Sequence, residues 1–515
     1  MSLLASTISY LQLLKLACPE AVVVISAVAV LTIGLTSRQG IAVASVSSGK
    51  PPTRGFGPRT ATDRCSLAAA LGLLIAIAAV FMLPRNVTLF GGMLVITPLT
   101  SFFKIICLVL AFFTVCLARS EKSLRHPGEY LAMVLLATVG LMLLVGSEEL
   151  LMIFIGLELL GLSLYVMAAF DKSDVRSAEA GLKYFLFGST SSAFTLFGIS
   201  LIYGMSGNTG LAAIAEKLTT ASAQPLLATG IVMTLIGFAF KIAAAPFHLW
   251  APDAYQGAPI PSAAFIASGS KVASFFVLGK IVLLGFGPVH GNSAWHAMAA
   301  GWSPVLAVVA ALSILIGNLV ALAQSNVRRL LAYSAVAHGG YTLLGLVAGG
   351  RDGFSATLFY TVVYSITLVG AFGVVSVVRT QTGGDDIKDF SGLAARSPLL
   401  AGCMAIFIFS LAGIPPLAGF FGKFYLFSAA LRAGGDHGLL WLIGLALFGS
   451  LVSLYYYLIV LKAVFVDLPS PAAPALDYVT FDLLQRITVT VLAAAILLLG
   501  IMPDALAARI LAAVP

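Results

Sequence analysis

Residues 235–261 read LIGFAFKIAAAPFHLWAPDAYQGAPIP, and this stretch decides the fold of the chain. It begins as an apolar helix that contains Lys241, and Pro246 interrupts the helix. A charged lysine is costly inside a membrane, and a proline removes a backbone donor and leaves a carbonyl unpaired. Broken backbone at membrane depth is tolerated only where it is buried in protein or lines a wet cavity. The stretch therefore predicts the wall of a polar passage, with a lysine that snorkels from a helix end as the simpler alternative.

The composition around this stretch is that of an all-α integral membrane protein. The 515 residues are 60% hydrophobic and 10% charged, with a mean hydropathy of +1.03, whereas soluble proteins carry about 25% charged residues. Continuous apolar runs exclude the alternating pattern of a β-barrel. The five cysteines form no CxxC pair and have no ligand-spaced histidine, so neither a disulfide framework nor a metal site is predicted. We expect no binding to nucleic acid from the net charge of +8, because membrane topology explains where the charges lie.

The apolar runs predict about 14 transmembrane helices of roughly twenty residues. The expected spans are 10–36, 66–84, 98–118, 129–146, 149–170, 178–204, 224–255, 260–286, 303–323, 328–348, 354–378, 398–431, 438–466 and 486–511. In alternate connections from the first, sixteen lysines and arginines gather, against four in the others: Arg85, Lys217, Arg351 and Arg432. The positive-inside rule places the rich set in the cytoplasm. Both termini are then expected outside, as an even number of spans requires.

A second interrupted span predicts the domain organisation. Residues 398–431 would make a helix of about 50 Å, and they contain Pro415 and Pro416 next to Lys423. Paired Pro/Gly-interrupted segments indicate inverted repeats. The interrupted spans are the seventh and the twelfth, so we expect discontinuous helices there and two inverted five-helix repeats. The predicted domains are 1–128, with helices 1–3 and a mobile, basic cytoplasmic loop at 37–65, the repeats 129–286 (helices 4–8) and 303–466 (helices 9–13), and the C-terminal helix 486–515.

Ionisable residues deep in apolar spans are the candidates for proton transfer, because such residues are expensive there and are functional by default. They are Glu158, Lys183, Lys241, Lys271, His338 and Lys423. Glu158 and Lys183 lie on consecutive antiparallel spans at depths that allow an ion pair, with a purely stabilising pair as the alternative. At about 10 Å and an effective dielectric constant near 20, a charge moved there would act on Lys241 with on the order of 1.7 kcal/mol.

Other polar residues have supporting roles in this interpretation. We expect Pro246, Pro415 and Pro416 to break the helices, and His248 and Asp253 to support the broken backbone rather than to carry protons. Lys104 and Glu20 are interpreted as interfacial or partner-facing, and Lys280 as a snorkelling side chain. Three consecutive tyrosines at 455–457 could hydrate a passage, but we interpret them as packing residues.

These stretches carry a family resemblance. FKIAAAPFHLWAPDAYQGAP resembles the broken seventh helix of the antiporter-like subunits of respiratory complex I and of Mrp cation/proton antiporters. LELLGLSLYVMAAF, AEAGLKYFLFGSTSSAFTLFGISLIYG and RRLLAYSAVAHGGY resemble the N subunit of bacterial NADH-quinone oxidoreductase, relative of mitochondrial ND2. The resemblance extends from about 129 to 465. It matches Glu158, Lys183, Lys241, Lys271 and Lys423 with the charged residues of family helices 5, 6, 7, 8 and 12; a lysine at the last position and the short C-terminus favour N over the M and L types.

The resemblance implies a proton-translocating subunit of a translocase-class enzyme in the bacterial inner membrane. NADH, FMN, iron–sulfur clusters and quinone would belong to other subunits, and this chain would hold no redox cofactor or metal. Neighbouring M-type and K-type subunits and the lipid bilayer are the expected partners. A subunit of an Mrp-type cation/proton antiporter and a non-pumping scaffold subunit remain alternatives.

Overall fold

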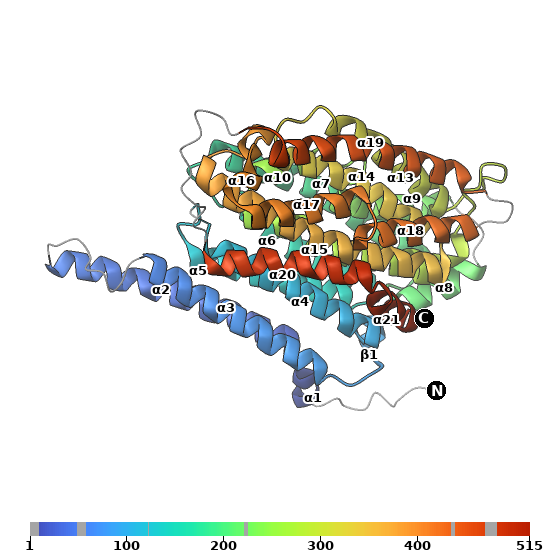
Figure 1. Ribbon diagram of the computed structural model, residues 1–515. Coiled ribbons are helices and arrows are strands. Elements are labelled where there is room, and N and C mark those ends of the chain that lie inside the picture. The colour runs from blue at the N-terminus through green and yellow to red at the C-terminus, as the bar shows by residue number, and fades with distance from the viewer. Residues whose placement is uncertain are drawn as a thin grey trace.

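The computed structural model describes residues 10–48, 58–121, 123–220, 225–433, 438–468 and 482–514. Most of its helices run side by side in one bundle (Figure 1). Among the described residues, twelve helical stretches are long and apolar enough to cross a membrane, and two shorter apolar helices, α9 (Pro225–Lys241) and α17 (Pro398–Ala412), stop at breaks. The predicted all-α membrane class is confirmed, whereas the count of fourteen crossings stays a prediction.

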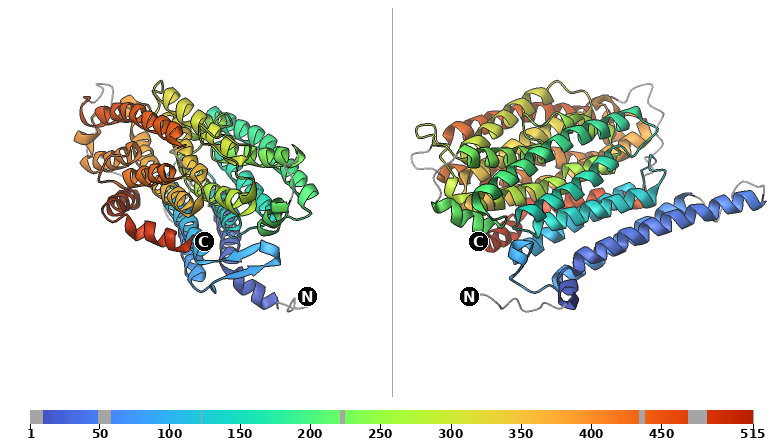
Figure 2. Two further views of the ribbon diagram at one scale, coloured as in Figure 1. Left: turned by 90° about the vertical axis from the view of Figure 1, so that its right-hand side faces the viewer. Right: turned by 180° about the vertical axis from the view of Figure 1, so that it is seen from behind.

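The N-terminal part contains a pair of long helices that packs against one side of the bundle. Its elements are α1 (Tyr10–Leu16), α2 (Cys18–Ser48), α3 (Pro58–Phe81), β1 (Val87–Leu89), η1 (Phe90–Gly92), β2 (Leu94–Ile96) and α4 (Pro98–Ala118). α2 and α3 lie side by side along the bundle, and the end of α2 and the start of α3 extend beyond it (Figures 1 and 2). A Cβ atom at Gly34 of α2 would stand 2.8 Å from the Cα of Gly128, so two glycines let α2 approach the bundle closely.

The basic connection expected at 37–65 is largely helical. α2 continues to Ser48 and α3 begins at Pro58, so the prediction of a loop was wrong over most of its length. Residues 49–57 of the predicted mobile loop lie outside the described residues. Basic residues are compatible with long helices that extend beyond a hydrophobic span, because lysine and arginine have good helix propensity.

The central part contains the first break. Its elements are α5 (Pro127–Val145), α6 (Leu150–Ala168), α7 (Val175–Ser206), α8 (Leu211–Thr220), α9, α10 (Trp250–Gly257), α11 (Ile260–Ala267), α12 (Gly269–Lys280), η2 (Ile281–Gly285, a π-helix) and η3 (Gly287–Val289). Side-chain oxygens begin two of these helices: Glu149 accepts from the amides of Leu151 and Met152, and Asp174 accepts from that of Arg176. Such caps satisfy the free amides at a helix start.

The C-terminal part contains the second break and the central helix. Its elements are α13 (Trp302–Ala321), α14 (Val327–Ala348), α15 (Gly350–Thr382), η4 (Ile387–Phe390), α16 (Leu393–Arg396), α17, α18 (Ala418–Arg432), α19 (Leu440–Phe465), α20 (Leu483–Ile501) and α21 (Asp504–Ala513). α15 packs against α4, α11, α12, α14, α17, α18 and α20, and most of it is buried. Two helices that carry candidate lysines, α12 with Lys271 and α18 with Lys423, therefore pack against one buried helix.

Candidate proton-transfer site

The first break places Lys241 inside the protein. α9 ends at Lys241, the chain turns through a positive φ at Ala243, and α10 begins at Trp250. Lys241 is 5% exposed, and its Nζ has no hydrogen-bond partner among the described residues. The ammonium lies against α6, because a Cβ at Gly161 would stand 2.9 Å from it, and it faces the Tyr165 ring at 5.4 Å from the ring centre. The snorkelling alternative does not apply to this lysine.

Side chains from other elements satisfy the broken backbone. The Trp250 indole donates to the carbonyl of Phe240 at 3.1 Å, and the amide of Ala245 donates to the Ser313 hydroxyl of α13 at 2.8 Å. Buried backbone groups need such partners, so these two bonds hold the break in one defined shape. His248, which we expected to support this backbone, is buried, and its Nδ1 has no hydrogen-bond partner among the described residues.

Glu158 does not pair with Lys183 in this structure. The Ser192 hydroxyl of α7 donates a short hydrogen bond to the Glu158 carboxylate. Ser192 follows Lys183 by nine residues, or about 13.5 Å of helix. The predicted ion pair was wrong because the two helices meet in a register that puts Ser192, rather than Lys183, opposite Glu158. Glu158 is one turn from Gly161, and its charge acts on Lys241.

Lys183 instead belongs to a charged bridge. Its ammonium lies 2.6 Å from Glu179 and 2.7 Å from Asp253, and its side chain is 38% exposed. The other carboxylate oxygen of Asp253 accepts from Arg329 of α14 at 2.6 Å. Asp253 therefore ties α10 to α7 and α14 through side chains, whereas the sequence had suggested a partner for broken backbone.

Lys271 points toward the C-terminal part of the chain. α11 and α12 are separated at Ser268, and Lys271 stands in the first turn of α12 with 2% exposure. Its ammonium donates to the carbonyl of Ala335 at 2.5 Å and faces the Tyr364 ring at 5.3 Å. No carboxylate contacts it in the described part of the chain.

His338 is held between two tyrosines. Its ring nitrogens lie 2.5 Å from the Tyr360 hydroxyl and 3.0 Å from the Tyr457 hydroxyl. Tyr457 also contacts the Ser334 hydroxyl at 2.5 Å. Since Ser334 immediately precedes Ala335 on α14, the hydroxyl of Tyr457 links the surroundings of Lys271 to His338.

The second break is closed by its own lysine. α17 ends at Ala412 beside Gly413 (φ 85°), and α18 begins after the cis Pro415–Pro416 bond. Lys423 is 5% exposed and donates to the Ala412 carbonyl and to the Ser450 hydroxyl, both at 2.9 Å. In the first break an indole satisfies the freed carbonyl, whereas here the candidate lysine does so.

Sequence reasoning missed several residues of this site. Tyr456 and Tyr457 were interpreted as packing. However, the Tyr456 hydroxyl donates to Asn318 at 3.1 Å, and the Tyr457 hydroxyl contacts both His338 and Ser334. Tyr455, by contrast, is 64% exposed. A period of about 3.6 residues places 456 and 457 on one buried face, but no sequence signal shows which tyrosine meets a histidine. Ser313 and Ser450 were also missed, because single serines in membrane helices are common.

Three further lysine and glutamate interpretations are corrected. Lys104 and Glu20 face each other as an ion pair of 2.6 Å, with side-chain exposures of 1% and 10%. Lys280 does not snorkel, because it is 4% exposed and lies 2.8 Å from Glu148. Each partner comes from another helix or turn far along the chain, so position within its own span could not reveal it.

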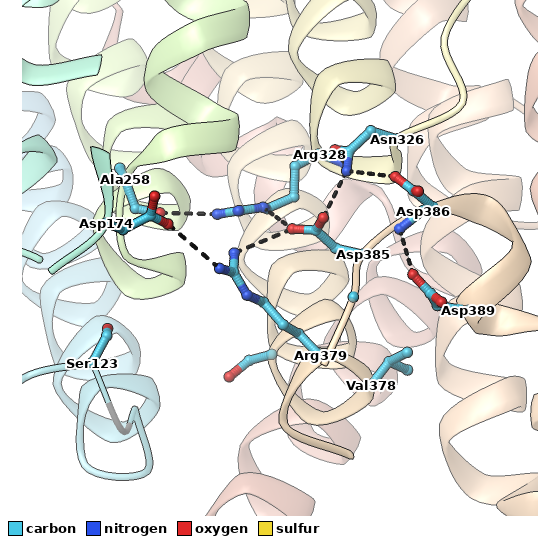
Figure 3. A network of polar contacts seen from close by, with 12 residues as sticks. Ser123, Asp174, Ala258, Asn326, Arg328, Val378, Arg379, Asp385, Asp386 and Asp389 are labelled. Carbon is cyan, nitrogen blue, oxygen red and sulfur yellow. Dashed lines mark hydrogen bonds and ion pairs between the residues drawn. The ribbon is translucent and has the colours of Figure 1, made fainter. Parts of the chain in front are cut away.

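A network of charges closes the end of the bundle where α7 and α14 begin (Figure 3). Arg328 donates to Asp385 and, at 2.9 Å, to the Ala258 carbonyl at the end of α10. Arg379 bridges Asp385 at 3.2 Å and Asp174 at 4.0 Å. Burial opposes the charge of Asp385, but its interactions with Arg328, Asn326 and Arg379 hold the pKa of its carboxyl below the usual value. The network therefore joins the two predicted repeats.

Comparisons with known proteins show which family the chain belongs to. The family model described as NADH:quinone oxidoreductase/Mrp antiporter, TM, matches residues 147–452. NADH-quinone oxidoreductase subunit N 2 of Acidobacterium capsulatum is 45% identical over 514 residues, covering 97% of this chain and 98% of that protein. The chain belongs to the NADH-quinone oxidoreductase subunit N family. Subunit N of Moorella thermoacetica is 41% identical, with 79% of this chain and 84% of that protein covered.

Solved structures agree with this family. A chain of respiratory complex I from Thermus thermophilus with bound Aureothin is similar at 32% identity and a TM-score of 0.71, covering 93% of this chain and 98% of that one. A chain of the Mrp complex from Dietzia sp. DQ12-45-1b has a TM-score of 0.74 at 22% identity, with 96% and 97% covered, which is a likeness of fold. Among the described residues, no group of three or more His, Cys, Asp or Glu is placed to hold a metal ion.

Proposed function

We propose that this chain is a proton-translocating membrane subunit of an NADH-quinone oxidoreductase. The observation that carries the proposal is a set of four buried ionisable side chains beside interrupted helices: Lys241, Lys271, His338 and Lys423. Their partners are carbonyls, hydroxyls and rings, and no carboxylate forms an ion pair with them in the described part of the chain. Burial disfavours the charged form of a lysine, and no fixed carboxylate counteracts this effect at these positions.

The proposed route runs from Lys241 through Lys271 and His338 to Lys423. Protons would arrive at Lys241 from the cytoplasm, and Glu158 would adjust its charge. Lys271 and His338 are joined through Ala335, Ser334 and Tyr457. His338 and Lys423 share Tyr341 as a neighbour, with the His338 and Tyr341 ring centres 5.6 Å apart and Lys423 Nζ 5.2 Å from the Tyr341 ring centre.

The proposal includes a membrane arrangement. We take α9 with α10 and α17 with α18 as single discontinuous crossings, which would complete fourteen, and we place the repeats at 129–286 and 303–466. The bacterial inner membrane would hold the chain with both termini outside; α1 and α21 lie at the same end of the molecule (Figure 1). M-type and K-type subunits would be its neighbours, and electron transfer with NADH, FMN, iron–sulfur clusters and quinone would take place in other subunits of this translocase.

Replacement of Lys241 by alanine tests this function. In membrane vesicles, Lys241→Ala is expected to lower proton translocation and coupled NADH–quinone activity while the complex still assembles. Near-normal pumping would overturn the proposal. Loss of complex in proportion to activity would favour the scaffold alternative, and sodium-dependent activity would favour a cation/proton antiporter. Lys388→Arg, at a side chain that is 81% exposed, is the control for the effects of mutagenesis and vesicle preparation.

A further inference from the structure

A second buried charge cluster lies outside the proposed route. It contains two ion pairs, Lys104–Glu20 and Lys280–Glu148, from α2, α4, α12 and the turn between α5 and α6. The two lysines are close enough for their charges to interact. The aromatic rings of Phe103 and Phe276, 4.7 Å apart, pack the helices that carry these lysines against each other. Two ammonium groups and two carboxylates thus share one site with no net charge.

The cluster changes from buried to exposed across its members. The side chain of Lys104 is 1% exposed, that of Lys280 is 4% exposed, and that of Glu148 is 31% exposed. The cluster lies at the end of the bundle near β1 and α21, away from the network of Figure 3 (Figure 1). Under the proposed topology this is the non-cytoplasmic end. Glu148 is therefore placed to exchange protons with outside water, and Lys280 is placed to supply them.

The backbone holds Glu148 as part of a built site. Its amide donates to the Gly92 carbonyl at 2.8 Å, and its carbonyl accepts from the amide of Leu211 at 2.9 Å. Lys280 also donates to the Ser147 carbonyl at 3.3 Å. The neighbouring Glu149 has another use, because it caps α6. A Cβ at Gly146 would stand 3.0 Å from the ammonium of Lys104, so the absence of a side chain there leaves room for this charge.

Helix α12 connects this cluster to the proposed route. It has only 12 residues, all buried, with Lys271 in its first turn and Lys280 at its last position. A break at Ser268 precedes it and the π-helix η2 follows it; π-helical turns are frequent at functional sites. The hydroxyls of Ser270 and Ser274 are buried without a partner among the described residues, and buried hydroxyls of this kind bond to internal water.

We propose that Lys280 and Glu148, supported by Lys104 and Glu20, form a second proton-exchange site at the non-cytoplasmic side of the first repeat. The inference rests on the proposed proton translocation and adds a release point to it. The Lys280 ammonium breaks one N–H bond and the Glu148 carboxylate takes the proton, which it then passes to outside water. The neutral Lys280 amine regains a proton that Lys271 releases and that water near α12 relays. Neither oxidant nor reductant is needed. If these ion pairs only held the helices together, they would add little to the stability of the fold, because apolar residues of similar volume often replace a buried ion pair with equal or better stability.

The decisive variant is Lys280→Arg. Arginine keeps the positive charge and can bond Glu148, but it does not deprotonate in proteins. We expect the assembled complex to retain NADH–quinone electron transfer, while protons moved per NADH in proteoliposomes fall to the level of the Lys241→Ala variant. Lys388→Arg provides the same chemical change at an exposed site. If Lys241→Ala is defective and Lys280→Arg shows a wild-type proton-to-NADH ratio in the same assay, this inference is overturned and the proposed function is not.

Glu148→Gln provides the second test if the larger arginine disturbs packing. Glutamine keeps the shape of the side chain and its partial exposure but removes the proton-accepting carboxylate. We expect the proton-to-NADH ratio of the assembled complex to fall in this variant too. An unchanged ratio, with reduced complex abundance only, would assign the cluster a structural role and overturn the inference. If Lys241→Ala pumps normally, the proposed function itself fails.

Discussion

Replacement of Glu158 by glutamine separates the charge of this residue from its hydrogen bond. Ser192 donates to the Glu158 carboxylate, and a glutamine oxygen accepts the same bond, so packing against α7 is retained. The lost quantity is the attraction between Glu158 and the charged form of Lys241. Gly161, against which Lys241 lies, follows Glu158 by three residues, or about 4.5 Å along the helix. We therefore take a separation of roughly 5–10 Å.

At an effective dielectric constant near 20, this separation corresponds to about 1.7–3.3 kcal/mol, a change of roughly 18- to 270-fold in the protonation equilibrium of Lys241. We expect Glu158→Gln to lower the rate of NADH-driven proton uptake into inverted vesicles at least tenfold, with normal complex abundance. Lys241→Ala is expected to abolish this uptake. Ser192→Ala is the matched control, since it removes the hydrogen bond and keeps the charge. Full pumping in Glu158→Gln, or an equal defect in Ser192→Ala, would refute the electrostatic reasoning.

Four other substitutions follow from the structure. Tyr457→Phe leaves Ser334 and His338 without a shared hydroxyl, costs about 1–3 kcal/mol and should lower the proton-to-NADH ratio without loss of complex, whereas Tyr455→Phe at the exposed neighbour should have no effect. Trp250→Phe strands the Phe240 carbonyl at a similar cost, measurable as a lower thermal stability of the purified complex. Gly419→Ala puts a Cβ 1.9 Å from the Ser410 carbonyl oxygen and should abolish assembly, as judged by native electrophoresis. Asp385→Asn leaves Arg328 poorly paired and should lower the free energy of unfolding by about 3–5 kcal/mol. The pKa of Asp385 lies below its usual value, so the stability that its charge contributes is lost only as the pH falls through that low value. The difference in stability between Asp385→Asn and the wild type should therefore be constant between pH 5 and 8.

The two helix breaks could be predicted because proline and lysine within a long apolar run have few compatible structures. Pro246 and Pro415–Pro416 cannot continue a regular helix, and Lys241 and Lys423 cannot face lipid cheaply. These local constraints do not depend on what lies across the bundle. The broken helices and the burial of both lysines therefore follow from the sequence alone.

The partners of the charged residues could not be predicted in the same way. Helical rise placed Glu158 and Lys183 at depths that long side chains could bridge, but an error of one or two turns in helix register changes the partner completely. Glu179 and Asp253 compete for Lys183 because α10 approaches α7 after the break. Lys104 and Glu20 were separated in the sequence by a whole helical hairpin, and only the packing of α2 and α4 brings them together.

The most direct measurement of the central claim is a cryo-electron microscopy map of the whole assembly that resolves internal water. We predict ordered waters that connect the ammonium groups of Lys241, Lys271 and Lys423 through the hydroxyls around His338. Dry apolar packing between these groups, with each lysine bonded only to its own backbone carbonyl, would contradict a proton route through this chain.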